Sequence, residues 1–337
     1  MNNPYCNFKC ILVVLASLLL CMNVHASNYK IDYFSIKHTK SELIDCVKIS
    51  NDSQKKPVIL FCVGSSPMPI ILSDEGSDYI LPLGNFDFES LLNSYNIVIF
   101  SHPYIPASAT IDQLDDNLYY FPNGDKDAEQ AYADSDYLEN HVKRAKRVIS
   151  YLRKQPWVER DKIIILGHSQ GAHVAAHVAM DNKLIYAVGY FCGNPLGRYA
   201  ESIAKDQKVL SMEPIIAKKD ALQSNINCSY DAWKSVCNPE NREANKFWIS
   251  FSHSYLESMS HIEANLFIAY GTEDNGSSSS VYIPIYLDIA QKTNYHIEAF
   301  VGRGHNFELI EDGKSNYDDM KWQEAIDKFV NWLEDIE

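Results

Sequence analysis

The stretch of residues 162–176 constrains the fold of this chain more than any other. It opens with a run of branched apolar residues at 163–166, as a strand buried on both faces of a sheet requires. The run breaks at Gly167, passes through Ser169, and resumes after Gly171 as an alanine-rich segment typical of a helix. Glycines on both sides let the strand and the helix pass close together. The pattern G-x-S-x-G therefore predicts a sharp strand-to-helix turn with the serine hydroxyl at its apex.

Short apolar runs and amphipathic segments alternate along the rest of the chain. Five runs have the pattern of buried strands: 58–63, 97–100, 185–191, 266–270 and 297–301. Helices are expected at 88–94, 138–152 and 322–336. Two earlier segments, 29–37 and 43–50, alternate as half-exposed antiparallel strands do. This order predicts an α/β fold whose central sheet is mostly parallel and flanked by helices.

Two later loops give the serine its chemical context. The sequence G-T-E-D, which ends at Asp274, directly follows the apolar run 266–270, and G-R-G-H-N-F, which contains His305, follows the next run. A serine, then an acid, then a histidine, each after a buried strand, resembles the α/β-hydrolase superfamily over most of the chain. The resemblance implies a catalytic triad of Ser169, Asp274 and His305, with Glu273 as the rival acid.

The same resemblance implies an oxyanion hole made of backbone N–H groups. One donor is the residue after the nucleophile, Gln170, and the other lies in the loop after the strand that ends at Val63. That loop reads V-G-S-S where the family often has His-Gly, so the glycine is kept and the histidine is lost. Ser65 is the expected second donor, because a backbone N–H donor does not depend on the identity of the side chain. Ser66 is the alternative, and the conformation of the loop decides between them.

These residues predict a serine hydrolase that cleaves carboxylic esters through an acyl-enzyme and needs no cofactor or metal. A peptidase or amidase of the same fold stays open, and so does a thioesterase, although an exported protein rarely meets CoA thioesters. A non-catalytic binding protein on a hydrolase scaffold is the alternative from a different class.

Two segments interrupt the α/β alternation. Residues 104–133 form a long acidic and aromatic insertion without clear periodicity, of the kind that shapes a site at the end of a strand. At about 196–262 the alternation is lost again, where α/β-hydrolases usually insert a cap. We therefore expect one α/β-hydrolase domain at 27–337, with a helical cap inserted after the sixth strand.

The first residues have the composition of a targeting segment. Lys9 precedes an almost wholly apolar run at 11–22, and small residues lead to Ala26. This pattern predicts a signal peptide at 1–26 and a secreted or periplasmic protein. An uncleaved membrane anchor is the alternative, although the run is short for a membrane span.

The net charge limits the classes of molecule that the protein is expected to bind. A formal net charge of −14 argues against nucleic acid and against stable association with an anionic membrane, which leaves a small-molecule ester or acyl compound as the expected partner.

Three cysteines in apolar strand patterns are expected to be buried thiols: Cys46, Cys62 and Cys192. Cys228 and Cys237 lie close together in a polar stretch, where an exported protein could bridge them.

Four other histidines need a role. His173 and His177 share a helix face, but Val174 stands where a metal-binding H-E-x-x-H motif would have glutamate. Packing within the helix layer is the better interpretation of that pair. His168 is expected to support the site from within the turn. His102 ends a strand before a proline, so it is expected to be a turn histidine, with a position facing the cleft as the alternative.

Overall fold

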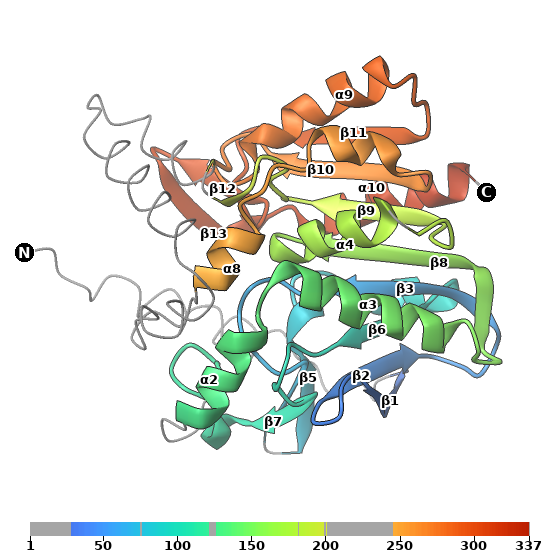
Figure 1. The fold of residues 1–337 in the computed structure, drawn as a ribbon, viewed down its shortest axis with the longest axis vertical. Helices are drawn as coiled ribbons and strands as arrows, with labels where there is room; N and C mark the ends of the chain where they lie inside the picture. The colour runs from blue at the N-terminus through green and yellow to red at the C-terminus, as the bar shows by residue number, and fades with distance from the viewer. Residues whose placement is uncertain are drawn as a thin grey trace, which may run out of the picture.

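The computed structural model describes residues 28–336 except 75, 121–125, 181, 199 and 201–244. Its centre is an eight-stranded sheet in the order β1-β2-β6-β3-β8-β9-β10-β11 (Figure 1). The strands are β1 (Lys30–Lys37), β2 (Leu43–Ser50), β3 (Lys56–Cys62), β6 (Asn96–Phe100), β8 (Val158–His168), β9 (Ala187–Phe191), β10 (Asn265–Gly271) and β11 (Tyr295–Phe300). Strand β2 is antiparallel to both of its neighbours, and the other neighbouring pairs are parallel.

Helices cover both faces of this sheet. One core packs the sheet against α3 (Leu138–Leu152) and α4 (Gln170–Met180). The other core packs it against α10 (Trp322–Asp335) and the 3-10 helix η3 (Glu89–Asn93), with α3 and α10 on opposite sides in Figure 1. Because both faces are covered, the central strands are continuous apolar runs.

Strand β2 is more buried than its alternating pattern predicted. It lies between β1 and β6 in the sheet, and a hydrophobic core covers each of its two faces. Ile44 and Cys46 belong to the core under α3, and Val47 and Ile49 belong to the core under α10. Only β1, at the edge of the sheet, shows the half-exposed pattern expected of the pair.

The insertion expected at 104–133 contains regular structure. It includes β7 (Ser108–Thr110), the 3-10 turn η4 (Ile111–Gln113) and α2 (Lys126–Ser135). Strand β7 pairs with β4 (Ile71–Asp74), which pairs with β5 (Ser77–Ile80) ahead of the 3-10 turn η2 (Leu81–Leu83). Strands of three or four residues are too short to leave a periodic signal.

The predicted cap at about 196–262 lies largely outside the described residues. Its described end holds α8 (Asn245–Ser250) and the 3-10 helix η7 (Glu257–His261). Phe247, Phe251 and Tyr255 from this end are buried in the same core as α3 and α4, so these aromatic side chains serve packing. The predicted signal peptide at 1–26 and the pair Cys228 and Cys237 also lie outside the described residues.

The three remaining cysteines are buried free thiols, as expected. Burial raises the pKa of Cys46, Cys62 and Cys192 above the ordinary value of a thiol. Such thiols behave as small apolar side chains in the core of the domain.

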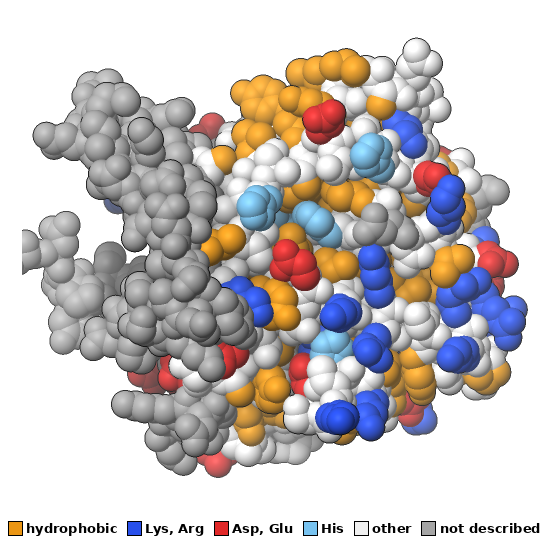
Figure 2. All heavy atoms as spheres, viewed as in Figure 1, with side chains coloured by type: hydrophobic (Ala, Val, Ile, Leu, Met, Phe, Trp, Pro, Cys, Tyr) orange, Lys and Arg blue, Asp and Glu red, His pale blue; other side chains and the backbone are white. Residues whose placement is uncertain are grey.

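Exposed apolar side chains gather around α9 (Ile283–Ile289) and the 3-10 helix η8 (Ser278–Tyr282) before it, at the top of the face in Figure 2. Ile285 and Ile289 are 53% and 76% exposed, whereas Ile283 and Leu287 of the same helix are buried. Helix α9 is therefore apolar on both its inner and its outer side. No helix within the described segments is both long enough and apolar enough to cross a membrane.

Candidate active site

The turn between β8 and α4 consists of Ser169 alone, since β8 ends at His168 and α4 begins at Gln170. The φ of Ser169 is +57°, in the left-handed region that costs an L residue about 1–2 kcal/mol. Its N–H donates to the carbonyl oxygen of Phe191 at 2.9 Å, which ties the turn to the neighbouring strand β9. The strained conformation is thus held by the sheet.

The two glycines of the turn are required by close approach, as the sequence predicted. A Cβ at Gly167 would lie 2.1 Å from the carbonyl oxygen of Gly171. A Cβ at Gly171 would lie 2.0 Å from the carbonyl oxygen of Cys62, at the end of β3. Any larger side chain would push the start of α4 away from β3 and β8.

The structure brings Ser169, His305 and Asp274 together in one hydrogen-bonded chain. His305 Nε2 lies 2.9 Å from Ser169 Oγ, and His305 Nδ1 lies 2.7 Å from Asp274 Oδ2. The three residues follow β8, β11 and β10, whose carboxyl ends meet at one edge of the sheet. Asp274 is buried beside the imidazole, whereas Glu273 is exposed. The arrangement lets His305 accept the serine proton while Asp274 orients the ring.

Asp274 is held as a carboxylate. Its Oδ2 also accepts the Ser277 hydroxyl at 2.6 Å, and its Oδ1 accepts the Gly276 N–H at 2.8 Å. Burial raises the pKa of Asp274, but the hydrogen bonds from His305, Ser277 and Gly276 outweigh burial, so the pKa lies below its ordinary value. A charged acceptor at Oδ2 favours the imidazole tautomer whose proton is on Nδ1, which leaves Nε2 free to act as a base.

Two side chains fix the loop that carries His305. His168 Nε2–H donates to the carbonyl oxygen of His305 at 2.8 Å, and burial lowers the pKa of His168 to about 3, so it is neutral. The side chain of Glu308 accepts the N–H of Asn306 at 2.7 Å, and its carbonyl oxygen accepts the N–H of Gly304 at 2.8 Å. His168 therefore supports the site, as the sequence predicted.

The loop continues into a hairpin of β12 (Glu308–Glu311) and β13 (Lys314–Met320). The turn between them is Asp312-Gly313, both with positive φ, which is the usual chemistry of a two-residue hairpin turn. This hairpin was not predicted from the sequence.

The expected oxyanion-hole segments lie on either side of the β3–α4 contact. Gln170 is the first residue of α4, where backbone N–H groups have no partner within the helix. The loop after β3 is anchored at three carbonyl oxygens. His102 Nε2–H donates to Gly64 at 2.8 Å, the N–H of Met68 donates to Ser66 at 2.8 Å, and the Tyr132 hydroxyl lies against Ser65 at 3.4 Å. The choice between Ser65 and Ser66 as second donor stays a prediction.

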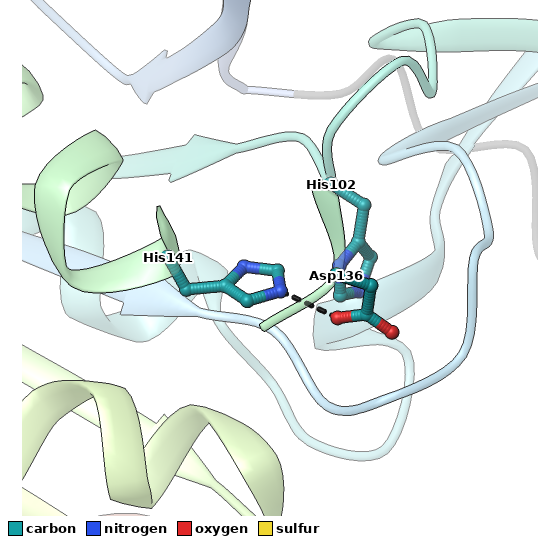
Figure 3. Close-up of side chains that lie close together, drawn as sticks. All are labelled: His102, Asp136 and His141. Carbon is teal, nitrogen blue, oxygen red and sulfur yellow. Dashed lines mark hydrogen bonds and ion pairs between the residues drawn. The ribbon is translucent and has the colours of Figure 1, made fainter. Parts of the chain in front are cut away.

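A buried polar group that the sequence analysis missed lies behind Gln170. Figure 3 shows His141 pointing at Asp136, with His102 beside them. His141 Nε2 lies 2.6 Å from Asp136 Oδ1, and the Tyr132 hydroxyl donates to Asp136 Oδ2 at 2.8 Å. Burial raises the pKa of Asp136, but His141, His102 and Tyr132 together lower it by more, so the pKa lies below its ordinary value. Helical periodicity gave no sign of this group, because the residues come from separate segments.

His102, Asp136 and His141 are of the types that bind metal ions, and one ligand atom from each lies within 4.8 Å of the others. The 2.6 Å between His141 Nε2 and Asp136 Oδ1, however, is a hydrogen-bond distance. Two atoms bound to the same zinc ion, each about 2.0–2.2 Å from it, would lie roughly 3 Å or more apart. The geometry therefore describes a direct hydrogen bond between these two residues. His102 opens a turn, as the sequence predicted, because its carbonyl oxygen accepts the N–H of Ile105 at 3.2 Å, and its side chain is buried.

His173 and His177 pack within the helix layer, as expected. His173 Nε2 accepts the N–H of Asn194 at 3.4 Å, and His177 Nδ1–H donates to the carbonyl oxygen of His173 at 2.8 Å. Both rings lie edge-on against Tyr255, with centroid separations of 5.2 and 4.6 Å. The pair fills the space between α4 and the segment before β10.

Known hydrolases resemble this chain in sequence and in fold. A family model described as "BAAT / Acyl-CoA thioester hydrolase C terminal" matches residues 145–309, a range that contains Ser169, Asp274 and His305. A search of curated proteins finds no significant match.

Solved structures of hydrolases share the fold. A putative dienelactone hydrolase from Klebsiella pneumoniae is 12% identical with a TM-score of 0.54, over 90% of this chain and 98% of that one. The acylaminoacyl peptidase of Pyrococcus horikoshii is 18% identical with a TM-score of 0.52, over 94% of this chain and 43% of that one. Porphyromonas gingivalis dipeptidyl peptidase 4 is 14% identical with a TM-score of 0.52, over 90% and 35%. The chain thus spans less than half the length of these peptidases, and the likeness confirms the predicted fold.

Proposed function

We propose that this chain is a serine hydrolase of the α/β-hydrolase superfamily that cleaves carboxylic esters through an acyl-enzyme. The observation that carries the proposal is the continuous hydrogen-bonded chain from Ser169 Oγ through His305 to the Asp274 carboxylate. A serine hydroxyl is a weak nucleophile until a base accepts its proton, and this chain supplies the base and the group that orients it.

In the acylation step, Ser169 Oγ attacks the carbonyl carbon of the ester while His305 Nε2 accepts the serine proton. The carbonyl oxygen becomes an oxyanion, which accepts hydrogen bonds from the backbone N–H groups of Gln170 and Ser65. The tetrahedral intermediate collapses, the bond to the leaving oxygen breaks, and His305 gives its proton to the departing alcohol.

In the deacylation step, water attacks the acyl-enzyme with His305 as the base, and the second intermediate releases the acid and regenerates Ser169. Asp274 keeps its charge throughout and stabilises the imidazolium that forms in both steps. The reaction needs protein groups and water alone, so the proposal includes no cofactor.

A thioester is the second candidate substrate, because the matching family model is described by acyl-CoA thioester hydrolysis. The likeness to peptidase structures concerns the fold alone. The only support for cleavage of an amide is therefore that peptidases and esterases can use the same serine nucleophile. A non-catalytic binding role has less support, since binding alone has no use for an ordered serine, histidine and aspartate.

Export and specificity belong to the same proposal. The pattern at 1–26 supports a secreted or periplasmic enzyme whose mature domain begins near Ser27. We propose that the cap at about 196–262 and the segment 104–133 shape the acyl pocket, and the net charge of −14 favours a small-molecule substrate over nucleic acid.

The test is turnover of three matched substrate classes with one acyl group: a p-nitrophenyl ester, an acyl-CoA thioester and an anilide. Esters of graded acyl length then define the pocket. The ester should be hydrolysed with the highest kcat/KM, and Ser169→Ala should abolish turnover. Ser150→Ala, on an exposed position of α3, is the matched control and should retain full activity. A higher kcat/KM for the thioester would favour the second candidate, and no turnover of any class would contradict the proposal.

A further inference from the structure

We propose that Asp136 is a positioning residue that holds both sides of the oxyanion hole through a buried hydrogen-bond network and the His102 ring packed against it. The network consists of Asp136, His141, Tyr132 and the side chain of Gln170, and the ring of His102 packs against Tyr132 and His141. The inference rests on the proposed function, because an oxyanion hole has a use only in acyl transfer. Asp136 is a buried carboxylate outside the triad, and the inference gives it a role in the reaction.

The first branch of the network reaches the donor that follows the nucleophile. Gln170 is 3% exposed, and its side-chain Nε2–H donates to Asp136 Oδ1 at 3.1 Å. The backbone N–H of this same residue is the first oxyanion donor. A fixed side chain at the first position of α4 restricts the rotation of the peptide group that presents this N–H to the substrate.

The second branch reaches the loop that carries the other donor. The Tyr132 hydroxyl lies 2.8 Å from Asp136 Oδ2 and 3.4 Å from the carbonyl oxygen of Ser65. The ring of His102 lies edge-on between Tyr132 and His141, with centroid separations of 6.0 and 5.5 Å. From there, His102 Nε2–H donates to the carbonyl oxygen of Gly64. The peptide group between Gly64 and Ser65, which carries the N–H of Ser65, is therefore anchored by His102, and the Tyr132 hydroxyl packs against the next carbonyl while donating its proton to Asp136.

The chemistry of Asp136 fits this task. The side chain is buried, and three donors converge on its two oxygens: His141, Tyr132 and Gln170. A buried carboxylate is costly unless such donors satisfy it, and an apolar side chain would fill the same space more cheaply. A charged acceptor makes stronger and more directional hydrogen bonds than a neutral acceptor, which is what the positioning of two separate segments requires.

The fall in kcat expected when the network is lost follows from the role of the oxyanion hole in the transition state. Oxyanion donors act in the transition state, so their misplacement lowers kcat and leaves the binding of the ground-state substrate nearly unchanged. Complete loss of one donor costs about 10²–10³-fold in kcat. Loosening both donors by less than their removal should cost about 10- to 100-fold.

The test compares Asp136→Asn with Asp52→Asn, a carboxylate in the turn before β3 that accepts the N–H of Gln54. Asp136→Asn keeps the shape of the side chain and removes one acceptor. Its kcat for the p-nitrophenyl ester should fall about 10- to 100-fold with KM changed less than threefold. The affinity for a trifluoromethyl ketone, which forms a tetrahedral adduct, should fall by the same factor. Asp52→Asn should leave kcat and this affinity unchanged.

A second variant keeps the inference testable if Asp136→Asn does not fold. Tyr132→Phe removes one donor from the network, and its kcat should fall at least threefold at unchanged KM. Tyr186→Phe, which loses a hydroxyl bonded to the carbonyl oxygen of Ile336, is its control and should have wild-type kcat.

Three results would overturn the inference. The first is a folded Asp136→Asn with wild-type kcat, and the second is a folded Tyr132→Phe with wild-type kcat if Asp136→Asn is lost. The third is a zinc-dependent rise in Tm that Asp136→Asn abolishes, which would make this group an ion site. Failure of the proposed function looks different, because the wild-type protein would then hydrolyse none of the substrates.

Discussion

Replacing Asp274 by asparagine removes the charge that orients His305. Asp274 Oδ2 accepts the Nδ1–H of His305 at 2.7 Å, and Oδ1 accepts the N–H of Gly276 at 2.8 Å. An amide has a single acceptor oxygen. If that oxygen faces Gly276, the amide NH₂ faces His305 and forces the ring proton onto Nε2, where it points at Ser169. In that tautomer the imidazole cannot accept the serine proton.

The opposite orientation of the amide is also costly. With the oxygen toward His305, the NH₂ group faces the N–H of Gly276, and a buried donor left without an acceptor costs about 1–3 kcal/mol. The Asp274→Asn variant therefore favours the unproductive tautomer. We expect kcat for the p-nitrophenyl ester to fall about 10³- to 10⁴-fold, equal to about 4–5.5 kcal/mol in the barrier, with KM changed less than threefold.

Initial rates across a range of ester concentrations separate kcat from KM for this variant. Glu273→Gln is the matched control, because the neighbouring carboxylate is exposed, and it should stay within twofold of wild type. A folded Asp274→Asn with more than a tenth of the wild-type kcat would refute the assignment of the acid. An equal loss in Glu273→Gln would refute it as well.

Two further predictions concern stability. Burial lowers the pKa of His102 from 6.5 to about 4, so the unfolded chain binds a proton that the folded chain excludes, and stability falls as the pH falls from about 6.5 toward 4. Urea unfolding at pH 7.5 and pH 5 should show a loss that is about 2 kcal/mol smaller in His102→Gln than in wild type, and an equal loss would contradict the burial argument. Gly171→Ala places a Cβ 2.0 Å from the carbonyl oxygen of Cys62 and should lower the free energy of unfolding by about 1–3 kcal/mol, whereas an unchanged urea midpoint would contradict the close approach.

The turn and the strands around it could be predicted because their signals are local. Strands buried on both faces are continuous runs of branched apolar residues, which are visible in the sequence. Gly167 and Gly171 indicate where the backbone of α4 lies close to β8 and β3. The order of Ser169, Asp274 and His305 added the topology, since each residue follows a strand of one parallel sheet.

The Asp136 network could not be predicted, because it depends on tertiary geometry. His102 follows β6, His141 lies on α3, and Gln170 begins α4, so no single window of sequence contains the group. Each residue also suits an ordinary role by itself, as a turn or helix residue. The burial of β2 was missed for a similar reason, since its alternating pattern does not show that a second core, which also contains residues of η3 and α10, covers its other face.

Labelling with a fluorophosphonate, followed by peptide mapping, tests the central claim most directly. The probe reacts with a serine only when a neighbouring base activates the hydroxyl, and His305 Nε2 lies 2.9 Å from Ser169 Oγ. We predict one modification, at Ser169, that disappears in Ser169→Ala without a change in Tm and persists in Ser150→Ala. A folded wild-type protein that does not react, or that reacts at another serine, would contradict the account.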